Sequence, residues 1–328
     1  MQTLRRAGWA TGRAGRRGAG STGSCGRSES RRGAYRASRG RLSTFARLER
    51  DAWQSAELSR AYADGFGSLT QQSVPAMLDA VGVAPGEELL DVATGPGYLI
   101  PSAISRGATV TGLDFSADML AIAATLRQRL WPLAADGKYS LESPRLKLVC
   151  GNAEELPFRT GSFDVVVCSF GVLHLPHPDR FLLEAHRVLR PGGRLAFTVW
   201  EAPPATVGFD VALRSIAEHG VSELDAGPPF FGFADPAVAA AACEAAGLVG
   251  ATTTSVPQTW HLANSQRLFQ VMAGATARTR AVIQAQPADA RQAIQRAIQR
   301  EVEASCRNEK GGFSFSMPAA LTSARKVA

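Results

Sequence analysis

Residues 89–99, LLDVATGPGYL, restrict the possible folds of this chain more than any other segment. The short apolar run around Asp91 is typical of a strand that is buried on both faces of a parallel sheet. Gly95 and Gly97 follow this run directly. Glycine allows the backbone to turn tightly and to approach a ligand closely. We therefore expect a buried strand that ends in a tight turn against a ligand.

A second apolar run, residues 108–113, ends in Asp114, which lies 17 residues after Gly97. A glycine turn after one strand and a carboxylate after the next strand hold the ribose of nucleotide-like ligands at the carboxyl edge of a parallel sheet. A dinucleotide would require a third small residue, but the chain has Ile100 at that position. The phosphate-binding pattern G-x-x-x-x-G-K-[ST] does not occur either. The pattern therefore favours a ligand with a ribose and an adenine but without phosphates.

Three further motifs follow in order. The apolar run at residues 146–150 precedes GNAEELPF at 151–158, FDVVVCSFG occupies residues 163–171, and LRPGGR at 189–194 introduces the apolar run 195–200. Strand-like runs alternate with helix-like segments from residue 88 to residue 200, which predicts βαβ units and a parallel sheet.

Together, LDVATGPG, NAEELPF, FDVVVCSFG and LRPGG resemble the class I S-adenosylmethionine-dependent methyltransferases, and most closely the ubiquinone/menaquinone C-methyltransferase group. The resemblance covers about residues 89–200. It implies an α/β fold: a doubly wound, seven-stranded Rossmann-like sheet with a helical cap. In this fold the last strand, which we expect at 318–327, runs antiparallel between the fifth and sixth strands. After Ser169 the chain has Val172-Leu173-His174 where the quinone group has an Arg-Asn pair. Quinone itself is therefore not specified as the acceptor.

The resemblance also implies the cofactor, S-adenosyl-L-methionine, and residues that contact it. The carboxylate of Asp114 is expected to accept hydrogen bonds from the ribose hydroxyls. Side-chain and backbone groups near the other strand ends are expected to hold the adenine and the methionyl part. These residues are Asp91, Gly95 and Gly97 for the methionyl part, Asn152 and Ala153 for the adenine, and Ser169 for the amino acid end. Ala93 replaces the first glycine of the family's turn.

A general base is needed if the acceptor is a phenol or a protonated amine. His174 follows the fourth predicted strand at the carboxyl edge, which makes it the candidate, with His177 and His261 as alternatives. Aromatic residues could line the acceptor site or belong to the core: Tyr62, Phe66, Phe230, Phe231 and Phe233. The sequence predicts no metal site, because the cysteines do not stand at metal-ligand spacing.

Residues 1–44 are rich in Arg, Gly and Ser and lack an apolar run, which predicts a disordered extension or an organelle transit peptide. Residues 1–50 carry a net charge of +11 and leave −4 for the other 278 residues, so the globular part is not expected to bind nucleic acid. We expect one methyltransferase domain at 45–328, in which residues 201–234 and 264–316 form the cap and bind the acceptor. Residues 133–144 are expected to form an enlarged loop.

Local patterns predict helices over residues 45–82, interrupted at 65–67, and over 179–189, 209–219, 268–283 and 288–304, with a strand at 252–261. No transmembrane segment is predicted. The odd number of cysteines, five, favours a reducing compartment. We expect the cytoplasm, or a mitochondrion or plastid if residues 1–44 are a transit peptide. The oligomeric state is left open.

The function expected is methyl transfer to a small or lipophilic acceptor. Three alternatives remain. An NAD-dependent oxidoreductase is disfavoured by Ile100 and by the Asn152-Ala153 pair. A nucleic-acid amino-methyltransferase would have a [D/N/S]-P-P-[Y/F] motif where this chain has Cys168-Ser169-Phe170-Gly171. A non-catalytic protein that only binds S-adenosylmethionine fits the same motifs.

Overall fold

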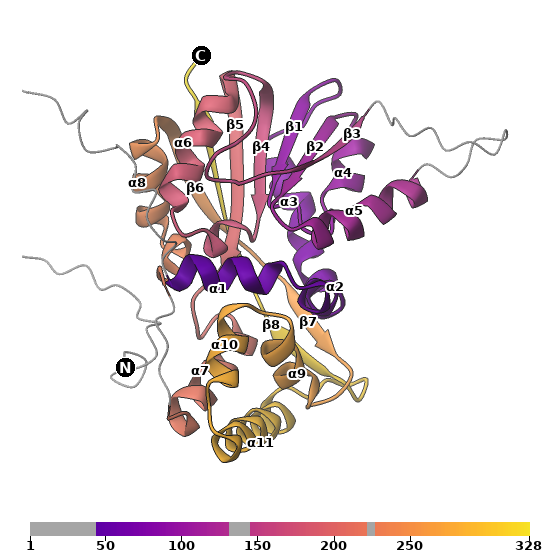
Figure 1. Ribbon diagram of the computed structural model, residues 1–328, viewed down its shortest axis with the longest axis vertical. Helices are drawn as coiled ribbons and strands as arrows, with labels where there is room; N and C mark the ends of the chain where they lie inside the picture. The colour runs from indigo at the N-terminus through magenta and orange to yellow at the C-terminus, as the bar shows by residue number, and fades with distance from the viewer. Residues whose placement is uncertain (1–43, 131–144, 222–226) are drawn as a thin grey trace, which may run out of the picture.

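The computed structural model describes residues 44–130, 145–221 and 227–328, without the side chains of 126–130. The predicted extension at 1–44, apart from Thr44, and the loop predicted at 133–144 lie outside the described residues. The rest of the chain forms a sheet flanked by helices, with a smaller, mainly helical layer at one end of the strands (Figure 1).

The main sheet has seven strands in the order β3-β2-β1-β4-β5-β9-β6. The first five strands in this order run parallel, whereas β9 pairs antiparallel with both β5 and β6. The strands are β1 (Glu88–Val92), β2 (Thr109–Asp114), β3 (Leu146–Cys150), β4 (Phe163–Ser169), β5 (Leu189–Trp200), β6 (Leu248–Val256) and β9 (Ala319–Lys326). The predicted fold class, including the antiparallel last strand between the fifth and sixth, is confirmed.

Burial explains why the central strands read as continuous apolar runs. Leu89, Leu90 and Val92 on β1 and Val165 to Val167 on β4 have no exposed surface. Strands covered on both faces bury successive side chains, not only alternate ones. Asp91, the polar residue inside this apolar run, is buried as well.

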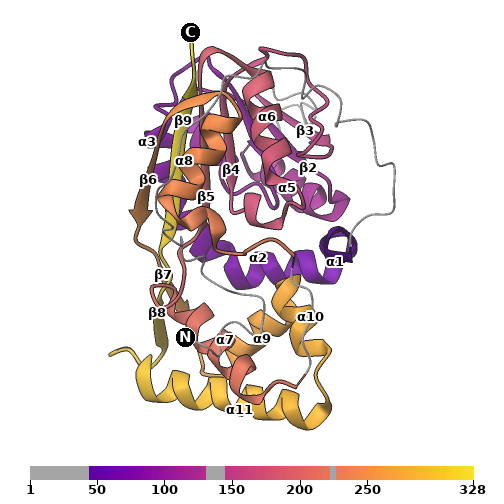
Figure 2. The ribbon, with the colours of Figure 1, turned by 90° about the vertical axis from the view of Figure 1, so that its left-hand side faces the viewer.

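Helices cover both faces of this sheet. Figure 2 shows α3 on one side and α6 and α8 on the other. The flanking helices are α3 (Val74–Ala80), α4 (Ile100–Ser105), α5 (Ala117–Leu130), α6 (Pro178–Val188) and α8 (Pro236–Ala245). The start of α8 agrees with its sequence pattern, because Asp235 accepts a hydrogen bond from the Ala237 N–H and Pro236 occupies the first helical position.

The cap layer lies beyond the carboxyl ends of the strands (Figure 2). It consists of α7 (Val207–His219), α9 (Arg267–Gly274), α10 (Arg278–Gln284), α11 (Ala288–Ser305) and the hairpin of β7 (Thr259–Leu262) and β8 (Phe313–Ser316). All of these elements except β7 lie within the two segments predicted as a cap, 201–234 and 264–316. The last part of the first segment, η5 (Gly232–Ala234), packs instead against α8, β5 and β9.

Two local predictions in the second half of the chain are wrong. The helix predicted at 268–283 is two helices: α9 ends at Gly274, and the Thr276 hydroxyl accepts the Arg280 N–H near the beginning of α10. The strand predicted at 252–261 is divided as well: β6 ends at Val256 and β7 begins at Thr259. Pro257, between them, has no N–H with which to continue the hydrogen bonding of a strand.

Helices α1 (Thr44–Trp53) and α2 (Ala56–Thr70) lie between the sheet and the cap layer (Figures 1 and 2). The break predicted at residues 65–67 is wrong, because α2 continues through these glycines and the chain breaks at Gln54-Ser55 instead. Close packing accounts for the glycines: a Cβ at Gly65 would lie 2.9 Å from Val271, and one at Gly67 would lie 2.3 Å from the Tyr98 hydroxyl.

Among the described residues, no helix combines the length and the apolar composition needed to cross a bilayer. The compartment expected from the sequence stays a prediction.

Candidate active site

A cavity of about 580 Å³ opens where the carboxyl ends of β1, β2 and β4 face α1 and α2. This volume lies within the range of sites that enclose ligands of several rings. Five of the seven residues predicted to bind the cofactor line it: Gly95, Asp114, Asn152, Ala153 and Ser169. The predicted base His174, its alternative His177 and the aromatic residue Tyr62 line it as well.

Asp114 ends β2 and is 6% exposed at the cavity wall. Its Oδ2 accepts a hydrogen bond from the Gly95 N–H at 2.8 Å, and its Oδ1 accepts one from the Ser116 N–H at 2.9 Å. Burial raises the pKa of this carboxyl, and the backbone hydrogen bonds partly offset the rise. An ionised carboxylate has about four acceptor positions, so acceptor capacity remains for donors from a ligand.

Two non-glycine residues adopt left-handed backbone conformations beside this cavity. Ala93, after β1, has φ of +54°, and Phe170, after β4, has φ of +53°. Such conformations cost about 1–2 kcal/mol for residues other than glycine, and they concentrate at functional sites. Both residues line the cavity at the ends of adjacent strands. Gly95 also has positive φ, +52°, and a Cβ placed there would meet no atom within 4 Å. The space above its backbone is therefore open.

Asp91 and Gly97 do not line the cavity in this structure. Asp91 is 1% exposed on β1, and its Oδ2 accepts a hydrogen bond from the Thr94 hydroxyl at 2.6 Å. Its Oδ1 is buried without a hydrogen-bond partner among the described residues. Burial, to which the charge of Asp114 adds, raises the pKa of Asp91 to about 7, against the opposing effect of Thr94. Gly97 lies within the turn before α4, with φ of +81°.

The residues predicted to contact an adenine follow β3, beside Asp114 at the end of β2. The Oδ1 of Asn152 accepts the Glu154 N–H at 3.0 Å, which fixes the amide at the rim of the cavity. A carbonyl oxygen has two lone pairs, so this atom retains a position for a second donor. Glu154 in turn accepts the His177 N–H at 2.7 Å, so His177 lines the cavity through the loop that follows η4.

A smaller hollow, which we call the aromatic chamber, adjoins this cavity. Its volume is about 30 Å³. Trp53, Tyr62, Phe170 and His174 line both spaces. The chamber is otherwise lined by Phe66, Trp200, Phe209, Phe230 and residues 275–279. Of the aromatic residues singled out in the sequence, Phe231 and Phe233 lie elsewhere: Phe233 packs edge-on against Phe197 of β5. His261 is on β7, where it contacts Ser314.

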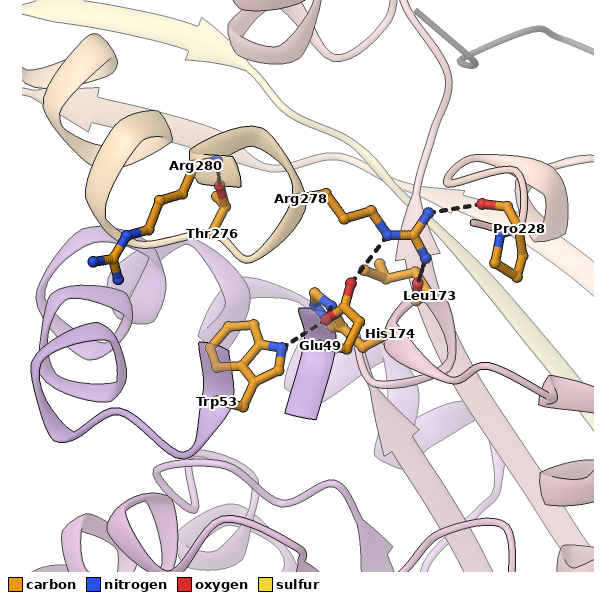
Figure 3. Close-up of polar contacts among 8 residues, drawn as sticks. All are labelled: Glu49, Trp53, Leu173, His174, Pro228, Thr276, Arg278 and Arg280. Atoms are coloured by element: carbon orange, nitrogen blue, oxygen red, sulfur yellow. Dashed lines mark hydrogen bonds and ion pairs between the residues drawn. The ribbon is translucent and has the colours of Figure 1, made fainter. Parts of the chain in front are cut away.

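His174 is held by a carboxylate from another part of the chain. It ends η4 (Val172–His174), and its Nδ1 lies 2.9 Å from the Oε2 of Glu49 on α1 (Figure 3). The indole N–H of Trp53 donates to the same Oε2 at 2.9 Å, and the Trp53 ring packs edge-on against the imidazole. No described residue forms a hydrogen bond with Nε2 of His174. The base candidate therefore has one nitrogen fixed by Glu49 and the other without a partner in this part of the chain.

Arg278 of α10 completes this cluster. Its Nε donates to Glu49 Oε1 at 3.1 Å, and its two terminal nitrogens donate to the carbonyl oxygens of Pro228 and Leu173 at 2.7 Å and 2.5 Å (Figure 3). The guanidinium also lies over the Phe45 ring, 4.3 Å from its centre. Burial alone would raise the pKa of the Glu49 carboxyl, but the neighbouring His174 and Arg278 hold it below its usual value.

Glu49 and Arg278 were missed in the sequence because neither belongs to a motif. A partial indication exists for Glu49. It lies four residues from both Phe45 and Trp53, so it occupies the apolar stripe of an amphipathic helix. A charged residue at such a position is buried and requires a partner. No local pattern identifies Arg278 as that partner, because it lies 229 residues away.

The site fits an adenosine-type cofactor by its own geometry. The wall combines a buried carboxylate that has unused acceptor positions with a backbone turn that is open above Gly95. A side chain at Gly95 would fill this space, which a ligand can occupy instead. Within the described ranges, no group of three or more His, Cys, Asp or Glu residues is arranged to hold a metal ion.

Comparisons with known proteins agree with this geometry. A family model described as a methyltransferase domain matches residues 90–197. The demethylmenaquinone methyltransferase of Beutenbergia cavernae is 39% identical over 129 residues, which are 39% of this chain and 47% of that protein. The ubiquinone/menaquinone biosynthesis C-methyltransferase UbiE of Brucella abortus is 42% identical over 143 residues, 42% of this chain and 49% of that protein. The match thus spans about half the length of these curated relatives.

Among solved structures, phosphoethanolamine N-methyltransferase 2 of Haemonchus contortus, in complex with S-adenosyl-L-methionine, superimposes with a TM-score of 0.51 at 17% identity. The match covers 88% of this chain and 61% of that one, and it supports the fold alone. The sequence motifs, the strand order and the family match agree: residues 90–197 match a methyltransferase domain, the type of domain that the class I resemblance predicts.

Proposed function

We propose that this protein transfers a methyl group from S-adenosylmethionine to a small, largely apolar acceptor. The observation that carries the proposal is the cavity at the carboxyl edge of the sheet. Asp114, Gly95 and Asn152, at the ends of different strands, face this single space together with His174 and several aromatic rings.

The cofactor side of the cavity would bind by hydrogen bonds and close backbone contact. Asp114 would accept both ribose hydroxyls, since Gly95 and Ser116 already orient its carboxylate. The Asn152 amide and the Ala153 N–H would meet the adenine edge, and Ser169 would contact the amino acid end. Asp91, which does not line the cavity, would hold the turn after β1 in place through its hydrogen bond with Thr94. Gly97 would allow the backbone conformation of that turn. When bound, S-adenosylmethionine supplies an electrophilic methyl group on a positively charged sulfur.

His174 would remove a proton from the acceptor. It is the histidine that lines both the main cavity and the aromatic chamber, and its Nε2 has no described partner. Positioning the acceptor and excluding water are the other tasks of the protein, because the reactive group belongs to the cofactor.

The aromatic chamber supports an apolar acceptor. Its rings offer flat apolar surfaces beside His174. Its volume of about 30 Å³ has room for roughly one water molecule, whereas a cavity that binds benzene measures about 150 Å³. An acceptor ring would therefore require the chamber to widen, by movement of the cap residues 275–279 or of Phe230. Two curated relatives are named for quinone methylation, which makes a hydroquinone one candidate acceptor.

The proposal is tested by measuring S-adenosylhomocysteine release from S-adenosylmethionine by mass spectrometry. The full chain is incubated with hydroquinones, simple phenols, primary amines and an RNA oligonucleotide in separate reactions. We expect acceptor-dependent release with an apolar hydroxylated compound, and loss of that release in His174→Gln, with cofactor affinity unchanged.

Cofactor binding without release for any acceptor would support the non-catalytic alternative. Release with RNA alone would contradict the assignment of a small-molecule acceptor. Oxidation of a hydroxyl acceptor with NAD, and no methylated product, would support the oxidoreductase alternative.

A further inference from the structure

We propose that Glu49 is a positioning residue that fixes the tautomer of His174, and that Arg278 of the cap holds Glu49 in place for this task. The inference deepens the proposed function, on which it rests. It concerns which imidazole nitrogen carries the proton before the acceptor binds.

The geometry determines the tautomer once Glu49 is ionised. An ionised carboxylate only accepts hydrogen bonds, so the hydrogen shared across the 2.9 Å contact with Nδ1 belongs to the imidazole. In neutral His174 the other nitrogen, Nε2, then carries a lone pair. Nε2 is the atom that would take the acceptor proton, which leaves a doubly protonated imidazolium hydrogen-bonded to Glu49. That proton is later released to solvent as the site reopens.

Three donors keep Glu49 ionised and oriented. Its Oε2 accepts from Trp53 and His174, and its Oε1 accepts from Arg278. The carboxylate and the guanidinium are almost fully buried, with 4% and 3% of their side chains exposed. A buried carboxylate that accepts several charge-assisted hydrogen bonds has little freedom to rotate or to take up a proton.

Arg278 connects this carboxylate to the cap. It lies at the first position of α10, and besides Glu49 it binds the Leu173 carbonyl, next to His174 in η4, and the Pro228 carbonyl (Figure 3). The same guanidinium therefore holds both the carboxylate and the backbone that carries the imidazole. We infer that docking of the cap against α1 and alignment of His174 occur together.

A purely structural ion pair between α1 and α10 would explain the same contacts without a role for the tautomer. The two explanations differ in the protonation of His174, which nuclear magnetic resonance measures directly. Long-range proton–nitrogen spectra of the ¹⁵N-histidine-labelled full chain distinguish Nδ1–H from Nε2–H. The His174 signal is identified by its loss in His174→Gln.

At a pH where His174 is neutral, we expect the Nδ1–H tautomer to dominate, with and without S-adenosylhomocysteine. In Glu49→Gln the amide offers both a donor and an acceptor, so we expect a mixture of tautomers. Glu49→Asp should restore the Nδ1–H form, at least in part. The control Asp79→Asn, which removes an exposed carboxylate paired with Arg106, should leave the spectrum unchanged.

Because Glu49→Gln leaves Arg278 buried beside a neutral side chain, its fold is checked by circular dichroism. If it unfolds, the double variant Glu49→Gln/Arg278→Gln, which also removes the guanidinium, serves in its place. A dominant Nε2–H tautomer in the wild type would overturn the proposal. A His174 spectrum unchanged in folded Glu49→Gln, or in the double variant that replaces it, would overturn it as well.

The spectrum requires no acceptor, so this test fails or succeeds separately from the proposed function. Where an acceptor is found, we expect Glu49→Gln to lower kcat about 100-fold while the KM for S-adenosylmethionine stays constant, as for loss of a general base. A wild-type kcat combined with a changed tautomer would contradict the catalytic role of His174 and leave the positioning by Glu49 intact.

Discussion

The two sides of the cavity are built in different ways. The cofactor side is made by strand ends and the few residues after them, and its contacts join neighbouring strands: Gly95 and Asp114 are 19 residues apart. On the base side, Glu49 contacts His174 across 125 residues and Arg278 across 229. The first side follows from the sheet itself, whereas the second depends on how α1, η4 and the cap pack together.

Each side contains a buried carboxylate, Asp91 on the cofactor side and Glu49 on the base side, and the pKa values of the two are shifted in opposite directions. Asp91 has one hydroxyl donor and an Oδ1 without a described partner, and burial raises its pKa to about 7. Glu49 has three donors, one of them a guanidinium, and its pKa is held below its usual value despite burial. Burial alone therefore does not decide ionisation; the donors around the carboxylate do.

Removal of Glu49 should destabilise the base side and leave cofactor binding unchanged. Glu49→Ala leaves Arg278 buried without its carboxylate, and we expect a loss of about 4 kcal/mol in the free energy of unfolding. Denaturant unfolding measures this loss, and Asp79→Ala serves as the matched control. Affinity for S-adenosylhomocysteine should change little. A loss below about 1 kcal/mol would mean that the ion pair of Glu49 and Arg278 does not contribute to the docking of the cap against α1.

The pH dependence of stability should separate the two carboxylates. For Asp91 the folded pKa of about 7 exceeds its usual value of 3.8, so the folded protein binds more protons than the unfolded chain between these values. Its contribution is complete below about pH 4 and is lost as the pH rises through 7, by about 4 kcal/mol at roughly 1.4 kcal/mol per pKa unit. Glu49 acts in the opposite direction: its contribution is present above its usual pKa and is lost as the pH falls through the lowered value.

Unfolding of wild type and Asp91→Asn between pH 4 and pH 8 measures the first contribution. The stability of the variant relative to the wild type should increase with pH. A constant difference between the two proteins would contradict a pKa near 7 for Asp91.

Asp114→Ala should weaken cofactor binding and leave the fold and the base side intact. Two hydrogen bonds to a charged group contribute about 1.5 kcal/mol or more each, so we expect affinity for S-adenosylhomocysteine to fall about 100-fold. Calorimetric titration measures the fall, and circular dichroism should show an intact fold. An affinity within threefold of the wild type would remove Asp114 from the proposed binding site. Asp79→Ala is again the control.

Ala93→Gly is expected to have the smallest effect, and it sharpens the comparison because it changes only the backbone of the cofactor side. A left-handed alanine costs roughly 1–2 kcal/mol, and glycine loses roughly 0.5–1 kcal/mol through chain entropy. We therefore expect a net stabilisation of about 0.5 kcal/mol, or a rise of about 1–2 °C in Tm. Calorimetric melting measures it, and a lower Tm would show that the methyl group of Ala93, which faces Gly171, matters more than the conformation.

The same difference decides what could be predicted from the sequence. Asp114, Gly95 and Asn152 are identified by motifs because strand order brings the ends of successive strands together. Glu49 and Arg278 could not be paired, since their contact depends on the packing of α1 against α10. For the same reason Phe233 could not be assigned to the core rather than to the acceptor site. The division of residues 268–283 falls between Gly274 and Arg278, where the Thr276 hydroxyl accepts the Arg280 N–H, and an apolar periodicity does not show such a break.

The most direct test of the account is calorimetric titration of the full chain with S-adenosylhomocysteine, with NAD titrated in parallel. The account predicts binding of S-adenosylhomocysteine in the micromolar range, at one site per chain, and no binding of NAD. Binding of NAD alone would contradict the central claim, that the cavity formed by Asp114, Gly95 and Asn152 holds the methyl donor.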